Sequence, residues 1–181
     1  MQVRDDVLER LNKTNLPLIY VQKWSLYDDA MLDADFEPGV ASAANRYVKL
    51  QWAIERTFTR LLASGRHILI VGEQVRAGCA IDRKRLLQGP LPHRPPPPCP
   101  PAPRTAVEAT NAPIDRMLAS MQARWPDQVR MFRPVDYFCD SECLMVKDGI
   151  WLYFNSTHFS VAGSRYMVDR SASVFRDFLT R

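Results

Sequence analysis

Two short apolar runs with an amphipathic segment between them constrain the fold of this 181-residue chain more than any other feature. Leu16 to Val21 and His67 to Gly72 read as buried strands, and Asn45 to Ser64 repeats apolar side chains at helical spacing before Gly65. A strand, a helix and a second strand in this order predict a right-handed parallel crossover. We therefore expect a three-layer α/β/α sandwich with a mainly parallel sheet.

The rest of the chain continues this alternation. Pro113 to Trp125 predicts a helix with Pro113 in its first turn, because proline is favoured at that position. Further elements are expected as a strand at residues 128–133, an extended segment at Trp151 to Phe154, a polar loop at Asn155 to Ser160 and a terminal helix from about residue 161.

Residues 88–105 form a proline-rich segment. Nine of the fourteen residues from Pro90 to Pro103 are proline. Proline fixes φ and has no backbone N–H, so the segment predicts neither a helix nor a central strand. We expect an extended surface loop, and a polyproline stretch that binds a partner is the alternative.

Length and composition indicate one globular domain over residues 1–181, with 46% hydrophobic and 24% charged residues. The net charge is +4, and Lys and Arg are scattered rather than interleaved with aromatic residues, so nucleic acid is not expected as a partner. The sequence has no apolar stretch of about 18 residues that would cross a bilayer, and Met1 is not followed by a signal-peptide pattern.

The four cysteines are spaced in a way that disfavours a metal site. They form no Cys-x-x-Cys pair and have no histidine at ligand spacing. Cys139 and Cys143 are predicted to lie close enough for a disulfide. Whether the bond forms depends on the compartment, since a reducing cytosol would leave two thiols.

His158 is the candidate functional residue among the three histidines. It lies in a polar segment, with Asn155 three residues before it and Ser160 two residues after it. A histidine in such a segment is a candidate general base, although surface or helix-capping histidines are also common there. His67 begins a strand and His93 lies among the prolines, so neither is given a role.

The segment from Leu152 to Ser164, with Asn155, His158 and Gly163, resembles the last block of SGNH hydrolases, where Asp-x-x-His is followed by serine and glycine. Cys139 and Cys143 with the following Gly149, the segment Val21 to Tyr27 and the strand from Gly65 to Gly72 resemble SGNH domains fused to membrane acyltransferases of the acyltransferase 3 type.

This resemblance implies serine-ester chemistry: a serine in a Gly-Asp-Ser turn attacks an ester, and the histidine is its base. It further implies transfer of acetyl groups on surface polysaccharide such as O-antigen, on the periplasmic side of the inner membrane. The expected partners are an acylated carbohydrate and a membrane acyltransferase domain.

The sequence departs from that family pattern at three points. It has no Gly-Asp-Ser turn, it has Asn155 where the acid would stand before His158, and the Val21 to Tyr27 segment lacks Gly-x-Asn-Asp, an oxyanion-donor motif. Ser25, Ser42 and Ser64 stand in no nucleophile context. In serine proteases the corresponding Asp to Asn change lowers turnover about ten-thousandfold by favouring the wrong histidine tautomer.

These departures lead to three hypotheses. The first is an inactive, N-terminally incomplete SGNH domain that lacks its first strand, with His158 and Asn155 as the remaining catalytic pair. The second is a non-catalytic module that binds a glycan or a partner. A flavodoxin-like nucleotide or flavin binder is disfavoured, because no glycine-rich phosphate turn is present and no cofactor is expected.

Overall fold

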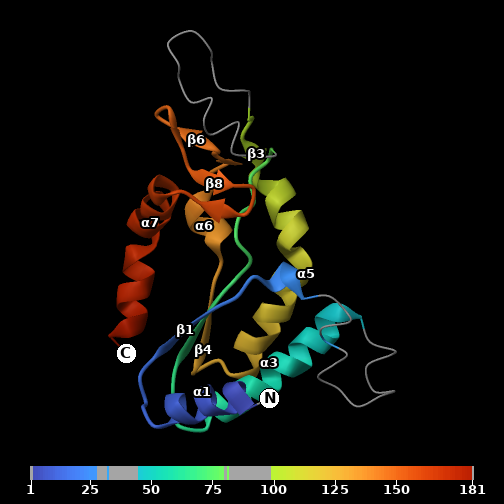
Figure 1. Ribbon diagram of the computed structural model, residues 1–181, viewed down its shortest axis with the longest axis vertical. Coiled ribbons are helices and arrows are strands. Elements are labelled where there is room, and N and C mark those ends of the chain that lie inside the picture. Colours follow the sequence, from blue (N-terminus) through green and yellow to red (C-terminus); the bar gives the residue numbers. More distant parts are fainter. Residues whose placement is uncertain (1, 28–31, 33–44, 80, 82–98, 181) are drawn as a thin grey trace. The chain divides into compact units, whose positions relative to one another are not determined.

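The computed structural model describes residues 2–27, 32, 45–79, 81 and 99–180 (Figure 1). The chain divides into two compact units. Unit 1 comprises Met1–Glu73 and Ala112–Phe132, and unit 2 comprises Gln74–Asn111 and Arg133–Arg181. Each unit encloses its own cluster of buried apolar side chains, and each is therefore described by itself.

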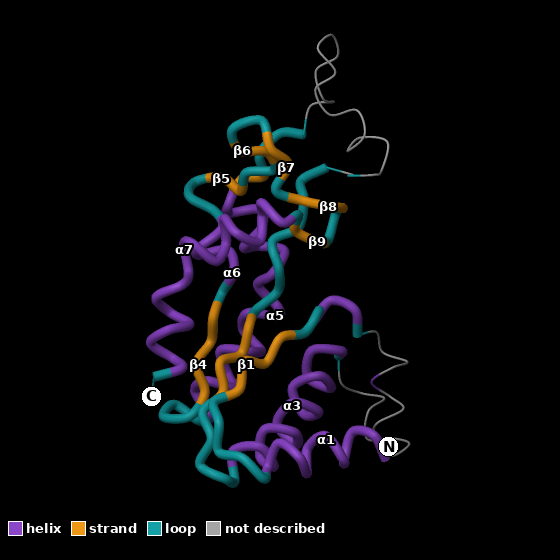
Figure 2. The backbone as a smooth tube through the Cα atoms, turned by 60° about the vertical axis from the view of Figure 1, so that its left-hand side comes forward, coloured by secondary structure: helices purple, strands orange, loops and turns teal. Residues whose placement is uncertain are grey.

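Unit 1 is built on a three-stranded parallel sheet of β1 (Leu18–Val21), β2 (Ile68–Val71) and β4 (Val129–Phe132), in the order β1-β2-β4 (Figure 2). The central strand, β2, is apolar throughout, as expected for a strand with neighbours on both edges. The sheet confirms the predicted α/β class and all three predicted strands.

Helix α3 (Arg46–Leu62) lies between β1 and β2 in the sequence. The Asn45 side chain accepts hydrogen bonds from the N–H groups of Tyr47 at 3.0 Å and Val48 at 3.2 Å, which satisfies donors at the helix start. Gly65 follows the helix with a φ of +78°, a conformation that favours glycine. The predicted helix is thus confirmed, and a side-chain cap and a glycine set its ends. Among the described residues before β2 there are also α1 (Gln2–Asn12) and the 3-10 helix η1 (Trp24–Leu26).

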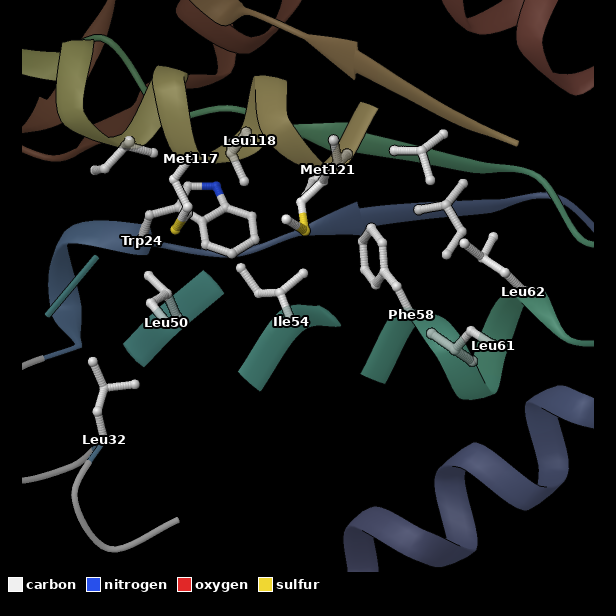
Figure 3. Close-up of a cluster of buried hydrophobic side chains, with 14 of the residues drawn as sticks. Trp24, Leu32, Leu50, Ile54, Phe58, Leu61, Leu62, Met117, Leu118 and Met121 are labelled. Carbon is white, nitrogen blue, oxygen red and sulfur yellow. The ribbon is translucent and has the colours of Figure 1, made fainter. Parts of the chain in front are cut away.

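The core of unit 1 lies against one face of this sheet. Leu18, Ile68 and Val129 form one row across the three strands, and all belong to the same apolar cluster. Figure 3 shows Phe58 of α3 and Leu118 of α5 (Arg104–Arg124) within this cluster, and both are fully buried. Unit 1 is therefore held by helices packed on a parallel sheet.

Helix α5 (Arg104–Arg124) corrects the prediction that a helix starts at Pro113. Pro113 lies inside the helix, where a missing N–H costs about 3 kcal/mol. Buried residues on both sides offset that cost, with Val107 packed in the core of unit 2 and Leu118 in that of unit 1. An ion pair between Arg104 and Glu108 at 2.9 Å also supports the first turns.

The end of the proline-rich segment is not all loop, as the sequence had suggested. Ala102–Pro103 form the short strand β3, which pairs antiparallel with β5 (Glu142–Cys143). A two-residue pairing of this kind tolerates proline, because the strand has no neighbour on its other edge. Residues 82–98 lie outside the described residues.

The described part of unit 2 contains the N-terminal part of α5, α6 (Pro134–Phe138), α7 (Val161–Leu179) and short antiparallel strand pairs. The predicted terminal helix is confirmed as α7. The extended segment predicted at Trp151 to Phe154 is divided between two pairs. These pairs are β6 (Val146–Lys147) with β7 (Ile150–Trp151), and β8 (Tyr153–Asn155) with β9 (His158–Phe159).

Two disulfides hold unit 2 together. Cys139 and Cys143 are bonded, with their Cα atoms 4.3 Å apart, which confirms the predicted proximity. Cys79 and Cys99 form a second bond across a sequence separation of 20 residues, which the sequence did not indicate. That pair joins Cys79, before the proline-rich segment, to Cys99 within it, and such a pairing leaves no local signal.

Candidate functional site

His158 lies on a tight β-hairpin rather than in the polar loop that the sequence suggested. Asn155 and His158 face each other across β8 and β9. The Nδ1 atom of His158 is 2.9 Å from Oδ1 of Asn155. The structure therefore brings together the two residues predicted as a pair, and it does so through a local turn.

The same turn determines which atom of the Asn155 amide faces the histidine. The backbone N–H of Thr157 donates to Asn155 Oδ1 at 2.9 Å, and an N–H group requires an oxygen acceptor. Because the atom near His158 is thus an oxygen, Nδ1 of the ring must carry a hydrogen to bond it. In the neutral ring, Nε2 then holds the lone pair, which is the arrangement of a general base. The Thr157 hydroxyl oxygen lies 3.2 Å from Asn155 Oδ1 and 3.2 Å from His158 Nδ1.

An aromatic cluster packs beside the hairpin. Phe159, next to His158, stacks on Phe138 with ring centroids 4.6 Å apart, and Tyr153 and Tyr166 approach Phe138 edge-on. Burial raises the pKa of Tyr153, whose hydroxyl donates to the Val75 carbonyl at 3.0 Å. The hairpin is thus built on a rigid apolar base, although His158 itself is exposed.

The start of α7 explains the residues after the histidine. Ser160 caps the helix by accepting from the Gly163 N–H at 3.1 Å, and its hydroxyl donates to the Trp151 carbonyl at 2.6 Å. A Cβ on Gly163 would lie 1.8 Å from the carbonyl oxygen of Leu152. Ser160 and Gly163 therefore have structural roles where α7 begins. Ser160 contributes hydrogen bonds, and Gly163 leaves room for the Leu152 carbonyl.

The sequence matches the family described as SGNH domain (fused to AT3 domains) over residues 2–172. The chain belongs to this SGNH family. No curated protein matches the sequence. Relatives in this family carry the domain fused to AT3 domains, which links the family to membrane acyltransferases. Within the described residues of this SGNH domain, no helix is long and apolar enough to cross a membrane.

A segment after β2 also ties down the hairpin of the SGNH domain. The side-chain amide of Gln74 donates to the Thr157 carbonyl. The backbone N–H of Ala77 donates to the Ser156 carbonyl at 3.2 Å, and that of Ile81 to the Ser156 hydroxyl oxygen at 3.2 Å. The turn that orients His158 is therefore held both by hydrogen bonds within the turn and by hydrogen bonds from the segment after β2.

Unit 1 holds a second polar group at the carboxyl ends of β1 and β2. The Glu73 carboxylate is buried, accepts from the Ser25 N–H at 2.8 Å and lies 3.4 Å from the Ser25 hydroxyl. The neighbouring Trp24 donates its indole N–H to the Val71 carbonyl at 2.7 Å. Sequence reasoning missed Glu73, although its place just after a buried strand marked this edge as a site for ligands.

The remaining candidate serines have structural contacts or lie outside the described residues. Ser64 donates to the Leu61 carbonyl at 3.2 Å near the end of α3, and Ser42 lies outside the described residues. In the described part of unit 2, the Ser171 hydroxyl donates to the Met167 carbonyl at 2.7 Å, and no serine hydroxyl there hydrogen bonds His158.

The other two histidines remain without a role. His67 precedes β2, and its carbonyl accepts from the Leu18 N–H at 2.9 Å, while His93 lies outside the described residues. Among the residues that the structure describes, no group of three or more His, Cys, Asp or Glu side chains is placed to hold a metal ion.

Proposed function

We propose that His158 is the proton acceptor of an acyl-ester site and that Asn155 is its orienting partner. The observation that carries this proposal is the contact of 2.9 Å between His158 Nδ1 and Asn155 Oδ1, with the amide oxygen identified by the Thr157 N–H. A ring held in this way presents Nε2 as the base that removes a proton from an attacking hydroxyl.

Asn155 performs only part of the task of an aspartate. It orients the ring and selects the tautomer, but a neutral amide does not stabilise the imidazolium that forms when Nε2 takes a proton. Because Asn155 selects the productive tautomer, the loss of turnover that the wrong tautomer would cause is avoided here. The loss of charge stabilisation remains.

We infer that the chain by itself does not turn over simple esters. A base is useful only when a nucleophile lies within about 2.6 to 3.2 Å of it. The 181-residue sequence contains no Gly-Asp-Ser, and the described serines of unit 2 make no hydrogen bond to His158. Among the described residues of unit 2, the proposed base therefore has no serine to activate.

The proposed substrate of this site is an acylated carbohydrate of a surface polysaccharide. The proposed partner is a membrane acyltransferase domain, and the proposed location is the periplasmic side of the membrane. The fusion of this family's domain to AT3 domains supports a membrane acyltransferase domain as the partner. The two disulfides support the location, because such bonds persist in oxidising compartments such as the periplasm. A non-catalytic role in binding the glycan is favoured by Asn155, and this second candidate uses the same hairpin.

Hydrolysis of p-nitrophenyl acetate by the purified chain tests the proposed inactivity. We expect a rate indistinguishable from buffer, for the wild type and for Asn155→Asp. Turnover above background that His158→Ala abolishes would overturn the inference, and Ser25→Ala would then show whether Ser25 is the nucleophile.

Titration of the isotope-labelled chain with an O-acetylated oligosaccharide tests the carbohydrate. We expect the NMR resonances of His158 and Thr157 to shift with the acetylated sugar and to shift less with the deacetylated one. Equal or absent shifts would contradict a role in binding acylated glycans.

A further inference from the structure

We call the segment from Gln74 to Ile81 the clamp, because it holds Ser156 and Thr157, the tip of the hairpin of β8 and β9. The side-chain amide of Gln74 donates to the Thr157 carbonyl. The backbone N–H of Ala77 donates to the Ser156 carbonyl, and that of Ile81 to the Ser156 hydroxyl oxygen, both at 3.2 Å. The described part of the clamp therefore contacts the tip from its first residue to its last.

A disulfide fixes the middle of the clamp. Cys79 is bonded to Cys99, with their Cα atoms 5.6 Å apart, and both cysteines pack against the apolar cluster of unit 2. In the sequence, Cys79 lies between Ala77 and Ile81, whose N–H groups contact the tip. Because a disulfide tolerates only a narrow range of Cα separations, this bond limits how far the two donors can move from the tip.

The tip of the hairpin depends on contacts from outside. β8 and β9 are three and two residues long, and a two-stranded hairpin is only marginally stable by itself. Tyr153 and Phe159 pair at the open end of the hairpin and pack in the aromatic cluster. Asn155 and His158 pair at the other end, where the Thr157 N–H orients the Asn155 amide. A change in the clamp is therefore transmitted to the contact between Asn155 and His158.

The two disulfides of unit 2 differ in exposure. Cys79 and Cys99 are half-buried, whereas Cys139 is 1% exposed and Cys143 is 0% exposed. Reduction begins when a thiolate attacks a sulfur of the disulfide, so it requires access to that sulfur. A reductant therefore reaches the bond at the clamp before it reaches the buried one.

We propose that the Cys79–Cys99 disulfide is a redox control of the His158 site. A dithiol, on a protein or a small molecule, attacks the bond, forms a mixed disulfide and leaves as its own disulfide. Two electrons and two protons pass to the sulfurs of Cys79 and Cys99, which become thiols. The clamp then holds the tip less tightly, and Asn155 orients the histidine ring less strictly. The effect on proton acceptance rests on the proposed function of His158, whereas the change in the tip does not.

Reduction of the purified full chain by dithiothreitol, followed by alkylation and peptide mass mapping, tests the first step. We expect the bond of Cys79 with Cys99 to be reduced at least about tenfold faster than that of Cys139 with Cys143, because of their different exposure. Equal rates, or earlier reduction of the buried pair, would overturn the proposal.

NMR of the isotope-labelled chain, with only the bond at the clamp reduced, tests the second step. Hydrogen exchange of the Thr157 amide should become at least about tenfold faster, and fewer neutral His158 rings should carry their proton on Nδ1. Reoxidation should reverse both changes. Because this measurement uses the wild type, it does not depend on the folding of a variant. Signals that stay unchanged after reduction of the bond would contradict the coupling.

Gln74→Leu and a matched control test the clamp contact with the disulfide intact. Gln74→Leu removes the donor to the Thr157 carbonyl, so it should change the Thr157 exchange rate and the His158 tautomer in the same direction as reduction does. Gln51→Leu makes the same substitution on α3, where the Gln51 amide donates to Glu55 at 3.0 Å, and should change neither signal. Ester hydrolysis enters none of these measurements, so their outcome is separate from that of the proposed function. Equal responses of the two variants would show a general loss of stability and overturn the role of the clamp.

Discussion

Gly163 and Leu152 approach so closely that a Cβ on the glycine would lie 1.8 Å from the leucine carbonyl oxygen. The contact joins the first turn of α7 to the segment before the His158 hairpin. We therefore expect Gly163→Ala to lower the free energy of unfolding by about 3 kcal/mol or more, because backbone atoms must move to admit the methyl group. Urea denaturation followed by circular dichroism measures this change.

Ser164→Ala is the matched control for that substitution. Ser164 is the next residue of α7 and is exposed, so its change should stay within about 0.5 kcal/mol. Similar effects of the two variants would contradict the close packing of Gly163.

The tautomer of His158 is expected to depend on Asn155. In the wild type, the neutral ring should carry its proton on Nδ1, because Asn155 Oδ1 accepts it at 2.9 Å. Asn155→Ala removes that acceptor and should move the proton largely to Nε2. Long-range ¹H–¹⁵N correlation spectra of the ring above pH 8 report the ratio directly.

Asn155→Asp and Thr157→Val serve as comparisons for this tautomer experiment. The aspartate retains an acceptor at Nδ1, and the valine retains the backbone N–H that fixes the Asn155 amide, so both should keep the proton on Nδ1. A wild-type ring with its proton on Nε2 would show that the amide presents its nitrogen instead.

The two disulfides are expected to stabilise the chain unequally. The bond from Cys79 to Cys99 closes a loop over a separation of 20 residues, against 4 for Cys139 to Cys143. In the chain-entropy account, the longer loop stabilises by about 3 kcal/mol and the shorter by about 2 kcal/mol. Paired Cys to Ser variants, compared by urea denaturation, should therefore lose more stability at the first pair. Alkylation and intact-mass measurement of the wild type should find all four cysteines bonded, and free thiols at either pair in the unreduced protein would contradict the bond assigned to that pair.

Tyr20 links stability to alkaline pH. Burial, with a smaller contribution from Tyr27, raises the pKa of Tyr20 from 10.0 to about 12. The folded state then holds the phenolic proton after the unfolded chain has lost it, so this contribution is complete below pH 10 and is lost between about pH 10 and pH 12. Its full size is on the order of 2 kcal/mol.

Tyr20→Phe should remove that part of the alkaline slope while keeping the ring contact with Phe58, whose centroid lies 5.3 Å away. Urea midpoints measured at pH 9, 10 and 11 compare the two proteins. Parallel curves would assign the loss of stability to other groups.

Elements with local signals were predicted correctly from the sequence. The three strands are apolar runs, α3 has Asn45 before it and Gly65 after it, and α7 starts at the Ser160 cap. The pairing of Asn155 with His158 was also accessible, since three residues separate them and a turn is enough to bring them together. In each case, the residues that decide the structure are neighbours in the chain.

Other features depended on residues far apart in the sequence. Pro113 lies inside α5 because buried residues on both sides offset its missing N–H, and the sequence does not show that burial. Cys79 pairs with Cys99, and Glu73 accepts from Ser25, across separations that carry no periodic signal. Which atom of Asn155 faces His158 was likewise decided by the turn geometry, through the Thr157 N–H. Capping and periodicity act within a few residues, whereas burial and long-range pairing exist only after the chain has folded, and this is why the sequence determined the elements and the tertiary structure determined the contacts of the site.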